Sequence, residues 1–219
     1  MSVLEQFGKN SIERVNKACQ GLMKGKGIVL IDDEDRENEG DLIFSAAHLS
    51  IDDVVKMLQD CSGIICLCLT EEKAAQLSLK PMVEKNTSLY QTAFTVTIEA
   101  KEGITTGVSA HDRWKTIHTA ISANSAAQLR QPGHVFPLIA RPGGVLERRG
   151  HTEGSVDLLK LANLAPYAVL CELMNRDGTM KKLPQLINYA HEHHLPLVSV
   201  EDIYQYRLSQ SRTLTEALA

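Results

Sequence analysis

Apolar residues follow two different spacings along the chain, and their alternation predicts a protein built from both strands and helices. Short runs that are mostly apolar predict strands buried in a sheet. These runs are 28–31, 42–44, 64–69, 135–139, 168–173 and 197–200. Between them, apolar residues recur every three or four positions, which predicts helices. The helical stretches begin near residues 11, 50, 70, 109, 152, 184 and 201.

Hydroxyl side chains stand in front of several of these helices and predict where they begin. Ser11, Ser50 and Ser109 each precede a helical stretch, in positions where a side-chain oxygen can accept a hydrogen bond from a first-turn N–H. The alternation in Phe94–Ile98 predicts a half-exposed strand. Residues 81–92 are expected to form a loop, and residues 124–133 a flexible connection.

Strands that alternate with helices predict an α/β fold in which a sheet is covered on both faces. Two strand-like segments, 41–45 and 93–106, have no crossover helix beside them, so the sheet is expected to be mixed and not wholly parallel. The chain has no linker, low-complexity tract or internal repeat. We therefore expect one domain over residues 1–219.

Composition narrows the possible classes of protein. The chain has 219 residues, 43% of them hydrophobic and 5% aromatic, and a net charge of −4. The apolar fraction suffices for a core, and the charge does not favour binding to nucleic acid or to an anionic membrane. The apolar runs are too short to span a bilayer, and the N-terminus lacks the pattern of a signal peptide. Most of the five cysteines lie in apolar stretches, which predicts free thiols and a cytoplasmic location.

The strongest chemical signal is a run of carboxylates between two predicted strands. Seven acidic side chains lie in the ten residues from Asp32 to Asp41. A solvated acidic turn is the common explanation for such a run. Here the run sits at strand ends, where α/β sheets bind ligands, and it includes Arg36 and Gly40, a cation and a place where backbone can approach a ligand. Its hard oxygen ligands favour magnesium or manganese, and no frame fits a calcium-binding EF-hand.

A second segment, Arg148 to Glu153, is suited to binding an anion. Arg148, Arg149 and Gly150 precede Thr152, which is a candidate N-cap, so guanidinium groups and free helix amides would converge on one spot. His151 lies beside the cap, where it can bind a metal or carry a proton. A basic loop with an ordinary helix cap explains the segment equally well.

Three further features are candidates for chemistry, each with a structural alternative. Glu172 interrupts an apolar strand, so it either faces solvent at the strand end or takes part in catalysis. His134 stands at the mouth of a strand, where a lone histidine more often has a structural role. The hydroxyls of 105–109 resemble an anion cradle, although a simple Ser109 cap is the better explanation.

Together these residues fit a small, phosphorylated and hydroxyl-rich substrate. A metal bound to neighbouring substrate oxygens would make the adjacent protons acidic, so enolisation becomes accessible near neutral pH. Two other classes stay open on the residues alone. One is a nucleotide- or RNA-binding module, which the low aromatic content disfavours. The other is a metal-binding protein without catalytic activity.

Four segments, 32–41, 105–113, 130–134 and 148–153, closely resemble the 3,4-dihydroxy-2-butanone 4-phosphate synthase family of riboflavin biosynthesis. The resemblance extends over nearly the whole chain. It implies a lyase that converts D-ribulose 5-phosphate to L-3,4-dihydroxy-2-butanone 4-phosphate and formate. It also implies magnesium or manganese as cofactor, two ions per site, a homodimer, and a three-layer αβα fold around a mixed sheet.

The resemblance also assigns roles to individual residues. It implies that Glu37 and His151 are metal ligands and that His134 and Glu172 are catalytic, which replaces the structural interpretation of His134. The residues expected to contact substrate are Arg36, Glu37, Asp41, Arg148, Arg149, Gly150, His151, Thr152 and Glu172. Some relatives carry a second domain, a GTP cyclohydrolase II, and we expect that activity to be absent here.

Overall fold

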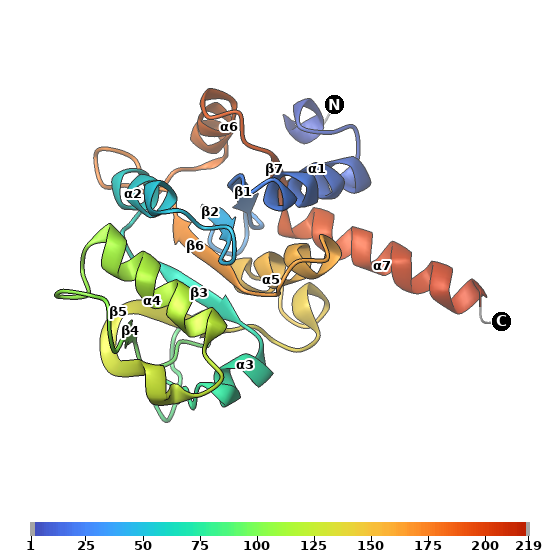
Figure 1. Cartoon of the computed structure of the whole chain (residues 1–219). Coiled ribbons are helices and arrows are strands. Elements are labelled where there is room, and N and C mark those ends of the chain that lie inside the picture. Colours follow the sequence, from blue (N-terminus) through green and yellow to red (C-terminus); the bar gives the residue numbers. More distant parts are fainter. Residues whose placement is uncertain (1–2, 218–219) are drawn as a thin grey trace.

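Seven strands form one mixed sheet in the computed structural model, which describes residues 3–217 (Figure 1). The strands are β1 (Ile28–Ile31), β2 (Gly40–Ser45), β3 (Cys66–Leu69), β4 (Ile98–Ala100), β5 (Leu129–Ile139), β6 (Ala168–Glu172) and β7 (Leu197–Ser199). Their order in the sheet is β4-β5-β3-β6-β2-β1-β7. The pairs β1–β7 and β3–β5 are parallel and the other four are antiparallel, which confirms the mixed sheet.

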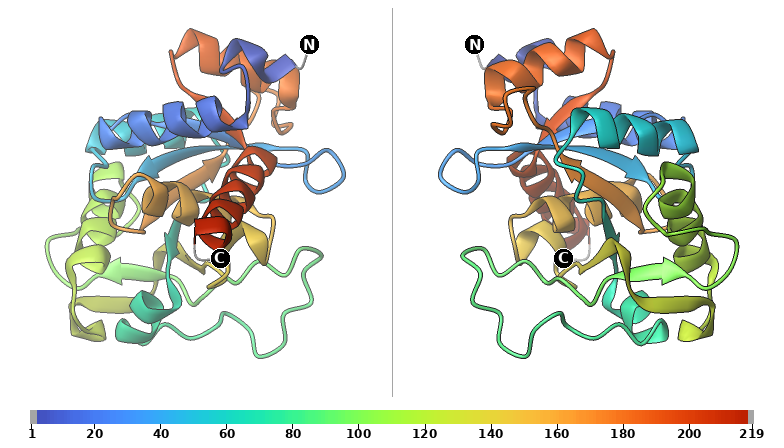
Figure 2. Two further views of the ribbon diagram at one scale, coloured as in Figure 1. Left: turned by 90° about the vertical axis from the view of Figure 1, so that its right-hand side faces the viewer. Right: turned by 90° about the vertical axis from the view of Figure 1, so that its left-hand side faces the viewer.

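Helices cover both faces of this sheet, so the three-layer αβα arrangement is confirmed (Figures 1 and 2). The α-helices are α1 (Ser11–Met23), α2 (Ile51–Asp60), α3 (Glu71–Gln76), α4 (Ala110–Ser122), α5 (His151–Leu161), α6 (Leu183–Glu192) and α7 (Val200–Ala217). Three short 3-10 helices are η1 (Val3–Gln6), η2 (Ala126–Gln128) and η3 (Gly144–Leu146). Helices α2, α4 and α6 pack on one face, and α1, α5 and α7 on the other.

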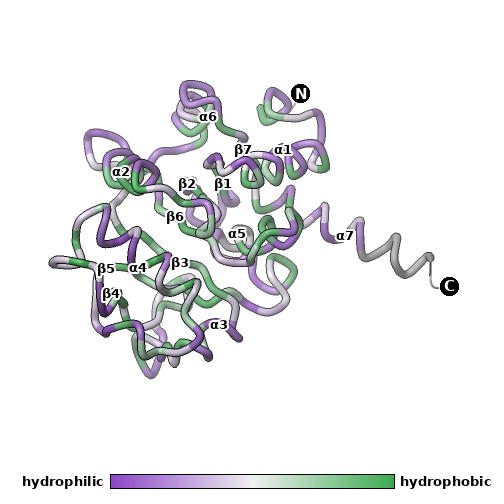
Figure 3. The backbone as a smooth tube through the Cα atoms, viewed as in Figure 1, coloured by the Kyte–Doolittle hydropathy of each residue, from purple (hydrophilic) through white to green (hydrophobic). Residues whose placement is uncertain are grey.

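The core divides into two apolar clusters because successive side chains of a strand point to opposite faces. In β1, Val29 and Ile31 join the cluster under α2, α4 and α6, whereas Ile28 and Leu30 join the cluster under α1, α5 and α7. In Figure 3 the hydrophobic segments lie mostly among the strands, and the hydrophilic segments lie mostly on the outer helices and loops. Side chains of β1 and β2 are buried in these clusters, so the strands at both ends of the acidic run are held in place.

Helix starts agree with the sequence to within one residue. Ser50 and Asp53 form a reciprocal capping box at α2, and the Ser109 side chain caps α4, as predicted. At α1 the N-cap is Asn10 and not Ser11, whose hydroxyl donates to Asp202 instead. At α5 the N-cap is Gly150, so the prediction of Thr152 as the cap was wrong. Helix α5 therefore begins at His151.

Two predictions about the segments near β4 were wrong. Regular strand structure covers only Ile98–Ala100, and the residues before it make isolated bridges. Residues 124–133 are not a flexible connection, because they contain η2 and the first part of β5. Pro132 and Gly133 lie at an irregularity of the β4–β5 ladder. A Cβ at Gly133 would lie 2.1 Å from the backbone of Ile98, so only glycine allows the two strands to approach.

Two sequence-based expectations can be compared directly with the described residues. All five cysteines are free and buried there, as predicted. Within residues 3–217, no helix combines the length and the apolar character needed to cross a membrane.

A buried ion pair joins the first and last helices. The guanidinium of Arg14 in α1 donates to both carboxylate oxygens of Asp202 in α7, at 2.8 and 2.6 Å. Asp202 also exchanges hydrogen bonds with Ser199, which caps α7. Burial alone would raise the pKa of Asp202, but the hydrogen bonds from Arg14, Ser11 and the Ser199 backbone outweigh it and lower that pKa.

We expect Asp202→Asn to lower the free energy of unfolding by about 3 kcal/mol at pH 7, because it leaves Arg14 buried without its counter-ion. Since the pKa of Asp202 is lowered on folding, its contribution is complete above the ordinary carboxyl pKa of about 4 and is lost as the pH falls through the folded value. Urea unfolding from pH 7 to pH 3 should show the gap between wild type and variant narrowing below about pH 4. The surface carboxylate pairing with Lys17 provides a control, Glu13→Gln, which should change stability little. A gap that stays constant with pH would contradict the assignment.

Candidate active site

The turn between β1 and β2 is built around the side chain of Asp32. One carboxylate oxygen accepts from the backbone N–H of Glu39 at 2.9 Å. The other accepts from the Glu37 N–H at 3.0 Å and from Nη1 of Arg36 at 2.8 Å. The Asp32 side chain is completely buried. The acidic run is therefore an ordered loop with an internal scaffold, and only its tip at Glu34 and Asp35 is exposed.

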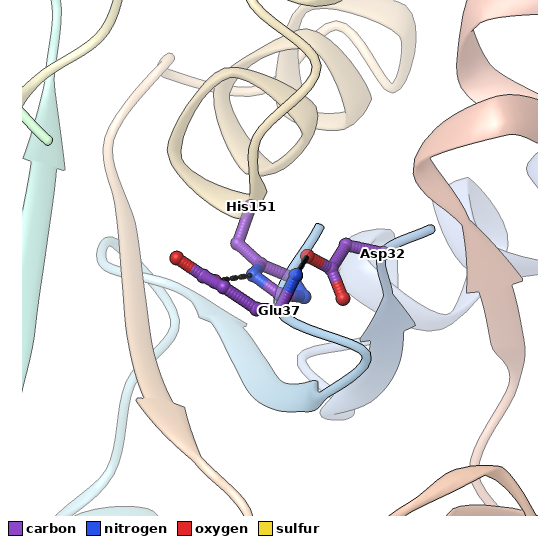
Figure 4. A group of neighbouring side chains, drawn as sticks. All are labelled: Asp32, Glu37 and His151. Carbon is purple, nitrogen blue, oxygen red and sulfur yellow. Dashed lines mark hydrogen bonds and ion pairs between the residues drawn. The ribbon is translucent and has the colours of Figure 1, made fainter. Parts of the chain in front are cut away.

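The first residue of α5 faces this turn. Figure 4 shows the His151 ring directed toward Glu37 and Asp32, which come from the two halves of the loop. Nδ1 of His151 lies 3.4 Å from Oε2 of Glu37 and 3.8 Å from Oδ2 of Asp41. His151 is 5% exposed and Asp41 2% exposed, so these charges are screened little by water. At these distances, Glu37 and His151 are close enough to bind one metal ion together.

Glu172 brings a further carboxylate to the same place. It ends β6 and lies opposite Asp41 of β2 in the antiparallel register. One of its oxygens accepts a hydrogen bond from the Ser62 hydroxyl at 2.9 Å. Gly40, beside Asp41, is needed for packing, because a Cβ there would lie 2.7 Å from the Leu186 side chain.

The charges in this cluster shift one another's pKa values. Burial disfavours the imidazolium of His151, but Asp41, Glu37 and Asp32 outweigh it and raise its pKa to about 9. Burial raises the pKa of Asp41 to about 7, and the nearby carboxylates add to the rise while His151 opposes it. Burial also acts to raise the pKa of Glu37, but His151 and Arg36 overcome it and lower that pKa. The positive groups of the cluster therefore do not fully neutralise its carboxylates.

The donor set fits a divalent cation. Ligand atoms of Asp32, Glu37 and His151 all lie within 4.8 Å of one another. Two buried atoms in the cluster, Nε2 of His151 and Oδ1 of Asp41, have no hydrogen-bond partner. Such orphaned polar atoms are costly unless a ligand completes them. Both carboxylate oxygens of Asp32 already accept hydrogen bonds within the turn, so Glu37 and His151 are better placed to bind a metal. Carboxylate oxygens are typical ligands of magnesium and manganese.

Arg148 supplies positive charge on another side of the cluster. Its Nη1 donates to Glu153 at 2.6 Å, and its Nη2 donates to the Thr92 hydroxyl at 3.0 Å. Gly150 leaves room for this arrangement, since a Cβ there would lie 2.3 Å from the Arg148 guanidinium. Glu153 lies in the first turn of α5, where the helix dipole favours an acid.

These groups line a cavity of about 180 Å³. Seven residues expected to bind substrate or metal line it: Arg36, Glu37, Asp41, Arg148, His151, Thr152 and Glu172. The sequence did not indicate Thr92 and Phe94, which enter from the loop after α3, and it indicated only core packing for Cys66. Leu138 and Leu170 complete an apolar wall. Acidic groups, arginines and an apolar wall thus surround one small volume.

Arg149 points elsewhere, although it follows Arg148 directly. Its Nη2 lies 2.9 Å from Asp33 and pairs also with Glu201 of α7, and its guanidinium lies 4.9 Å from the centre of the Tyr204 ring. Neither Arg149 nor Gly150 lines the cavity as the structure describes it.

His134 also lies outside the cavity lining. Its Nδ1 is 3.2 Å from Glu99, and its side chain is 43% exposed. The register nevertheless aligns it with the site. Cys66 of β3 is paired with Phe136 of β5 on one side and with Leu170 of β6 on the other. His134 comes two residues before Phe136, and Glu172 comes two residues after Leu170. Because β5 is parallel to β3 and β6 is antiparallel, these two residues lie level with each other on the same face of the sheet, with β3 between them.

The hydroxyl-rich segment 105–109 is hydrogen-bonded to the carboxylate of Asp112 in the first turn of α4. Asp112 accepts from the Thr105 hydroxyl and from the backbone N–H groups of Thr105 and Gly107. These bonds, that from the Thr105 side chain first, lower the pKa of Asp112 to about 2. The cap interpretation is therefore correct. A Cβ at Gly107 would lie 2.7 Å from Nδ1 of His134, so this segment packs against the His134–Glu99 pair.

Nearly the whole chain is similar to proteins of one family. Residues 16–206 match the family model described as 3,4-dihydroxy-2-butanone 4-phosphate synthase. A synthase of that name from Shewanella halifaxensis is 58% identical over 210 residues, which cover 95% of this chain and 99% of the relative.

Two solved structures of synthases with the same name share the fold. One, solved in complex with two magnesium ions, superposes with a TM-score of 0.87 at 33% identity, covering 90% of this chain and 97% of the other. A two-domain synthase from A. baumannii gives a TM-score of 0.85 at 42% identity, covering 89% of this chain. The present chain spans 57% of that longer protein.

We expect magnesium to raise the melting temperature of the wild type through Glu37 and His151. A ligand at about 100 times its Kd stabilises the folded state by about 2.7 kcal/mol, which is about 5–10 °C for a chain of this size. Glu37→Gln should abolish the rise in a thermal-shift titration. Glu34→Gln, at the exposed tip of the same loop, is the matched control and should keep it. An equal rise in the Glu37 variant would contradict this metal site.

Proposed function

Since the chain belongs to the 3,4-dihydroxy-2-butanone 4-phosphate synthase family, we propose that the cavity beside His151 is the active site for the family's reaction. The protein is a lyase of riboflavin biosynthesis. It converts D-ribulose 5-phosphate to L-3,4-dihydroxy-2-butanone 4-phosphate and formate, so a five-carbon sugar phosphate yields a four-carbon phosphate and one carbon as formate. The family membership is the premise of the residue assignments that follow.

Glu37 and His151 would hold magnesium or manganese, two ions per site. The unpartnered Nε2 of His151 and Oδ1 of Asp41 support this assignment, because both atoms are buried and Nδ1 of the same histidine lies 3.4 Å from Glu37. When bound there, the divalent ions would polarise the substrate's oxygens and acidify the adjacent C–H bond. Asp32 acts through the turn: its hydrogen bonds to the backbone of Glu37 and Glu39 orient the loop that carries the ligand.

Arg36 and Arg148 bind the phosphate group of the substrate. Both line the cavity, and guanidinium groups bind phosphate oxygens through paired hydrogen bonds. Thr152 lies in the first turn of α5, whose N–H groups lack intrahelical partners and favour an anion. Gly150 contributes by leaving space for Arg148. Arg149 adds positive charge near this end while it remains paired with Asp33 and Glu201.

Glu172 and His134 carry the proton transfers. Glu172 lines the cavity opposite Asp41, and the Ser62 hydroxyl orients its carboxylate. It is placed to exchange a proton at the carbon next to the ketone. His134 lies on the same face of the sheet at the same level, with its ring oriented by Glu99. We assign these two residues to successive proton movements in enolisation, loss of water and release of formate.

The observation that carries the proposal is the pair of buried, unpartnered atoms in a cavity that also holds two arginines. To test it, the purified protein is incubated with ribulose 5-phosphate labelled with ¹³C and with magnesium, and formate is detected by NMR. Formate should accumulate, and chelation should stop it. Glu172→Gln should lower kcat at least about 100-fold, since acid–base groups contribute about 10²- to 10⁴-fold. Absence of formate from the wild type would refute the proposed function.

Arg148 and Arg149 offer a matched pair of variants. Arg148→Lys keeps a cation beside Glu153 but loses the paired geometry, so KM for ribulose 5-phosphate should rise on the order of 30-fold, equivalent to about 2 kcal/mol. Arg149→Lys should raise KM less, because that guanidinium is held by two carboxylates outside the cavity. Steady-state kinetics measure both. A larger effect from Arg149→Lys would show that Arg149 is the main phosphate ligand.

We also propose that the protein is a homodimer in the cytoplasm. Ile64 and Val108 are 45% and 47% exposed. Ile64 lies two residues before Cys66, at the level of His134 and Glu172, and Val108 follows Gly107, which lies against His134. Arg113 links them, since it donates to the carbonyls of Gly63 and Val108. Exposed apolar residues grouped beside a site are typical of an interface. The buried free thiols support a reducing compartment.

Ile64→Asp should therefore weaken the dimer, because a charge would be buried in the interface. Light scattering with size-exclusion chromatography should give twice the mass of 24.2 kDa for the wild type and a smaller mass for the variant at low concentration. Val83→Asp, also at an exposed apolar position but in the loop after α3, is the control and should stay dimeric. A monomeric wild type would exclude the dimer.

A further inference from the structure

The loop between α3 and β4 reaches back across the molecule to the active site. Residues 82–89 are exposed throughout, and Figure 2 shows this stretch as a long excursion on the same side as the β1–β2 loop. Tyr90 is the first half-buried residue after it, whereas its neighbour Leu89 is 84% exposed. The tyrosine therefore marks the point where the loop makes contact with the rest of the chain.

Tyr90 holds Arg36 at two places. Its hydroxyl donates a hydrogen bond to the backbone carbonyl of Arg36. Its ring lies under the guanidinium of the same residue, 4.9 Å from ring centre to Cζ. The guanidinium is held from another side by Asp32 and Glu37, each at 2.8 Å. Arg36 thus has one fixed position at the wall of the cavity.

The same stretch of backbone holds Arg148. The carbonyl of Tyr90 accepts from Nη2 of Arg148 at 3.1 Å, and the hydroxyl of Thr92 accepts from the same nitrogen at 3.0 Å. Arg36 and Arg148 come from loops more than a hundred positions apart in the sequence. Tyr90 touches both, so it connects the two arginines that line the cavity.

We propose that Tyr90 is a positioning residue that presets Arg36 and Arg148 for the anionic end of the substrate. The inference rests on the proposed function, because it assumes that these arginines bind the phosphate. A long arginine side chain loses conformational freedom when it binds a ligand. Where the fold has already ordered it, that cost no longer counts against binding. Tyr90 does not line the cavity, so it acts on affinity through the arginines and takes no part in the chemistry.

The loop has other anchors, so Tyr90 can be changed without removing the loop's structure. Met82 donates its N–H to the Phe94 carbonyl, and the Asn86 amide donates to the Thr92 carbonyl. Ser88 bonds to the Asn86 side chain through both its N–H and its hydroxyl. None of these bonds involves the Tyr90 side chain.

Two substitutions separate the hydroxyl from the ring. Tyr90→Phe removes the hydrogen bond to Arg36 and keeps the ring, and we expect KM for ribulose 5-phosphate to rise about 3-fold. Tyr90→Leu also removes the contact with the guanidinium, and we expect a rise of about 10-fold. In both variants kcat should stay within about twofold of wild type, because the proton-transfer groups are untouched. Leu89→Ala is the control in the same loop and should match wild type.

A second readout does not depend on turnover. Isothermal titration with inorganic phosphate in the presence of magnesium should show the same order of weakening, Leu more than Phe. Magnesium affinity itself should be unchanged, since the hydrogen bonds and the ring contact of Tyr90 are with Arg36 and Arg148 and not with Glu37 or His151. A purely structural role would instead lower kcat and magnesium affinity along with phosphate affinity.

Several outcomes would overturn the proposal. One is a KM and a phosphate affinity within twofold of wild type in Tyr90→Leu, and another is a loss of kcat at constant KM. If Tyr90→Leu fails to fold, Tyr90→Phe decides: unchanged phosphate affinity refutes the proposal, and a loss supports it. If the wild type releases no formate, the proposed function fails, while the phosphate titration still tests the role of Tyr90.

Discussion

The packing of several carboxylates around one buried histidine is the constraint on which the site depends. Asp32, Glu37 and Asp41 approach His151, and Glu172 lies opposite Asp41. Buried like charges destabilise a fold unless cations or hydrogen bonds compensate them. Asp32 is compensated by Arg36 and two backbone N–H groups. Asp41 has only a distant contact with His151, and one of its oxygens has no partner. The deficit of positive charge is therefore localised beside Glu37, where a divalent ion would remove it.

This constraint explains why the acidic run is an ordered loop. Between the paired residues Ile31 and Gly40, the chain must turn while its carboxylates are held near one another. Asp32 makes this possible, because its side chain takes the place of backbone partners inside the turn. Its buried carboxylate thus stabilises the turn, and by holding Glu37 in place it would also orient a ligand for a metal bound there. The exposed tip at Glu34 and Asp35 contributes to neither.

Local signals in the sequence were enough for most of the fold. Buried strands, capping residues and the mixed sheet follow from patterns that extend over a few residues, as at Ser50 and Asp53. The failures have two physical causes, which are pairing with a distant segment and a helix cap without a side chain. Residues 124–133 look like a break, yet Gly133 fits into a strand because Ile98 lies against it. The start of α5 at His151 and not after Thr152 follows from Gly150, which has no side chain to signal a cap.

The site was predictable as a set of residues but not as a geometry. The acidic run and the Arg148 segment could be identified because charge is concentrated there. Nothing local distinguishes Arg148 from Arg149, and only the fold directs one into the cavity and the other toward Asp33 and Glu201. Thr92 and Phe94 carry no chemical signal, and they reach the cavity through the loop after α3.

The carboxylates and the arginines of the site are carried by different kinds of element, and this difference would determine how a sugar phosphate binds. The carboxylates of Asp41 and Glu172 stand on adjacent strands, so the sheet fixes them rigidly. The arginines come from loops and are ordered by contacts with other loop residues, as Arg148 is by Thr92. A substrate with an anionic end and a polyol end is repelled by one region and attracted by the other, so only one orientation is favourable. Under the proposed function, the phosphate would then lie against the loops, and the carbons that react would lie over the rigid strands, where proton-transfer groups must be held most accurately.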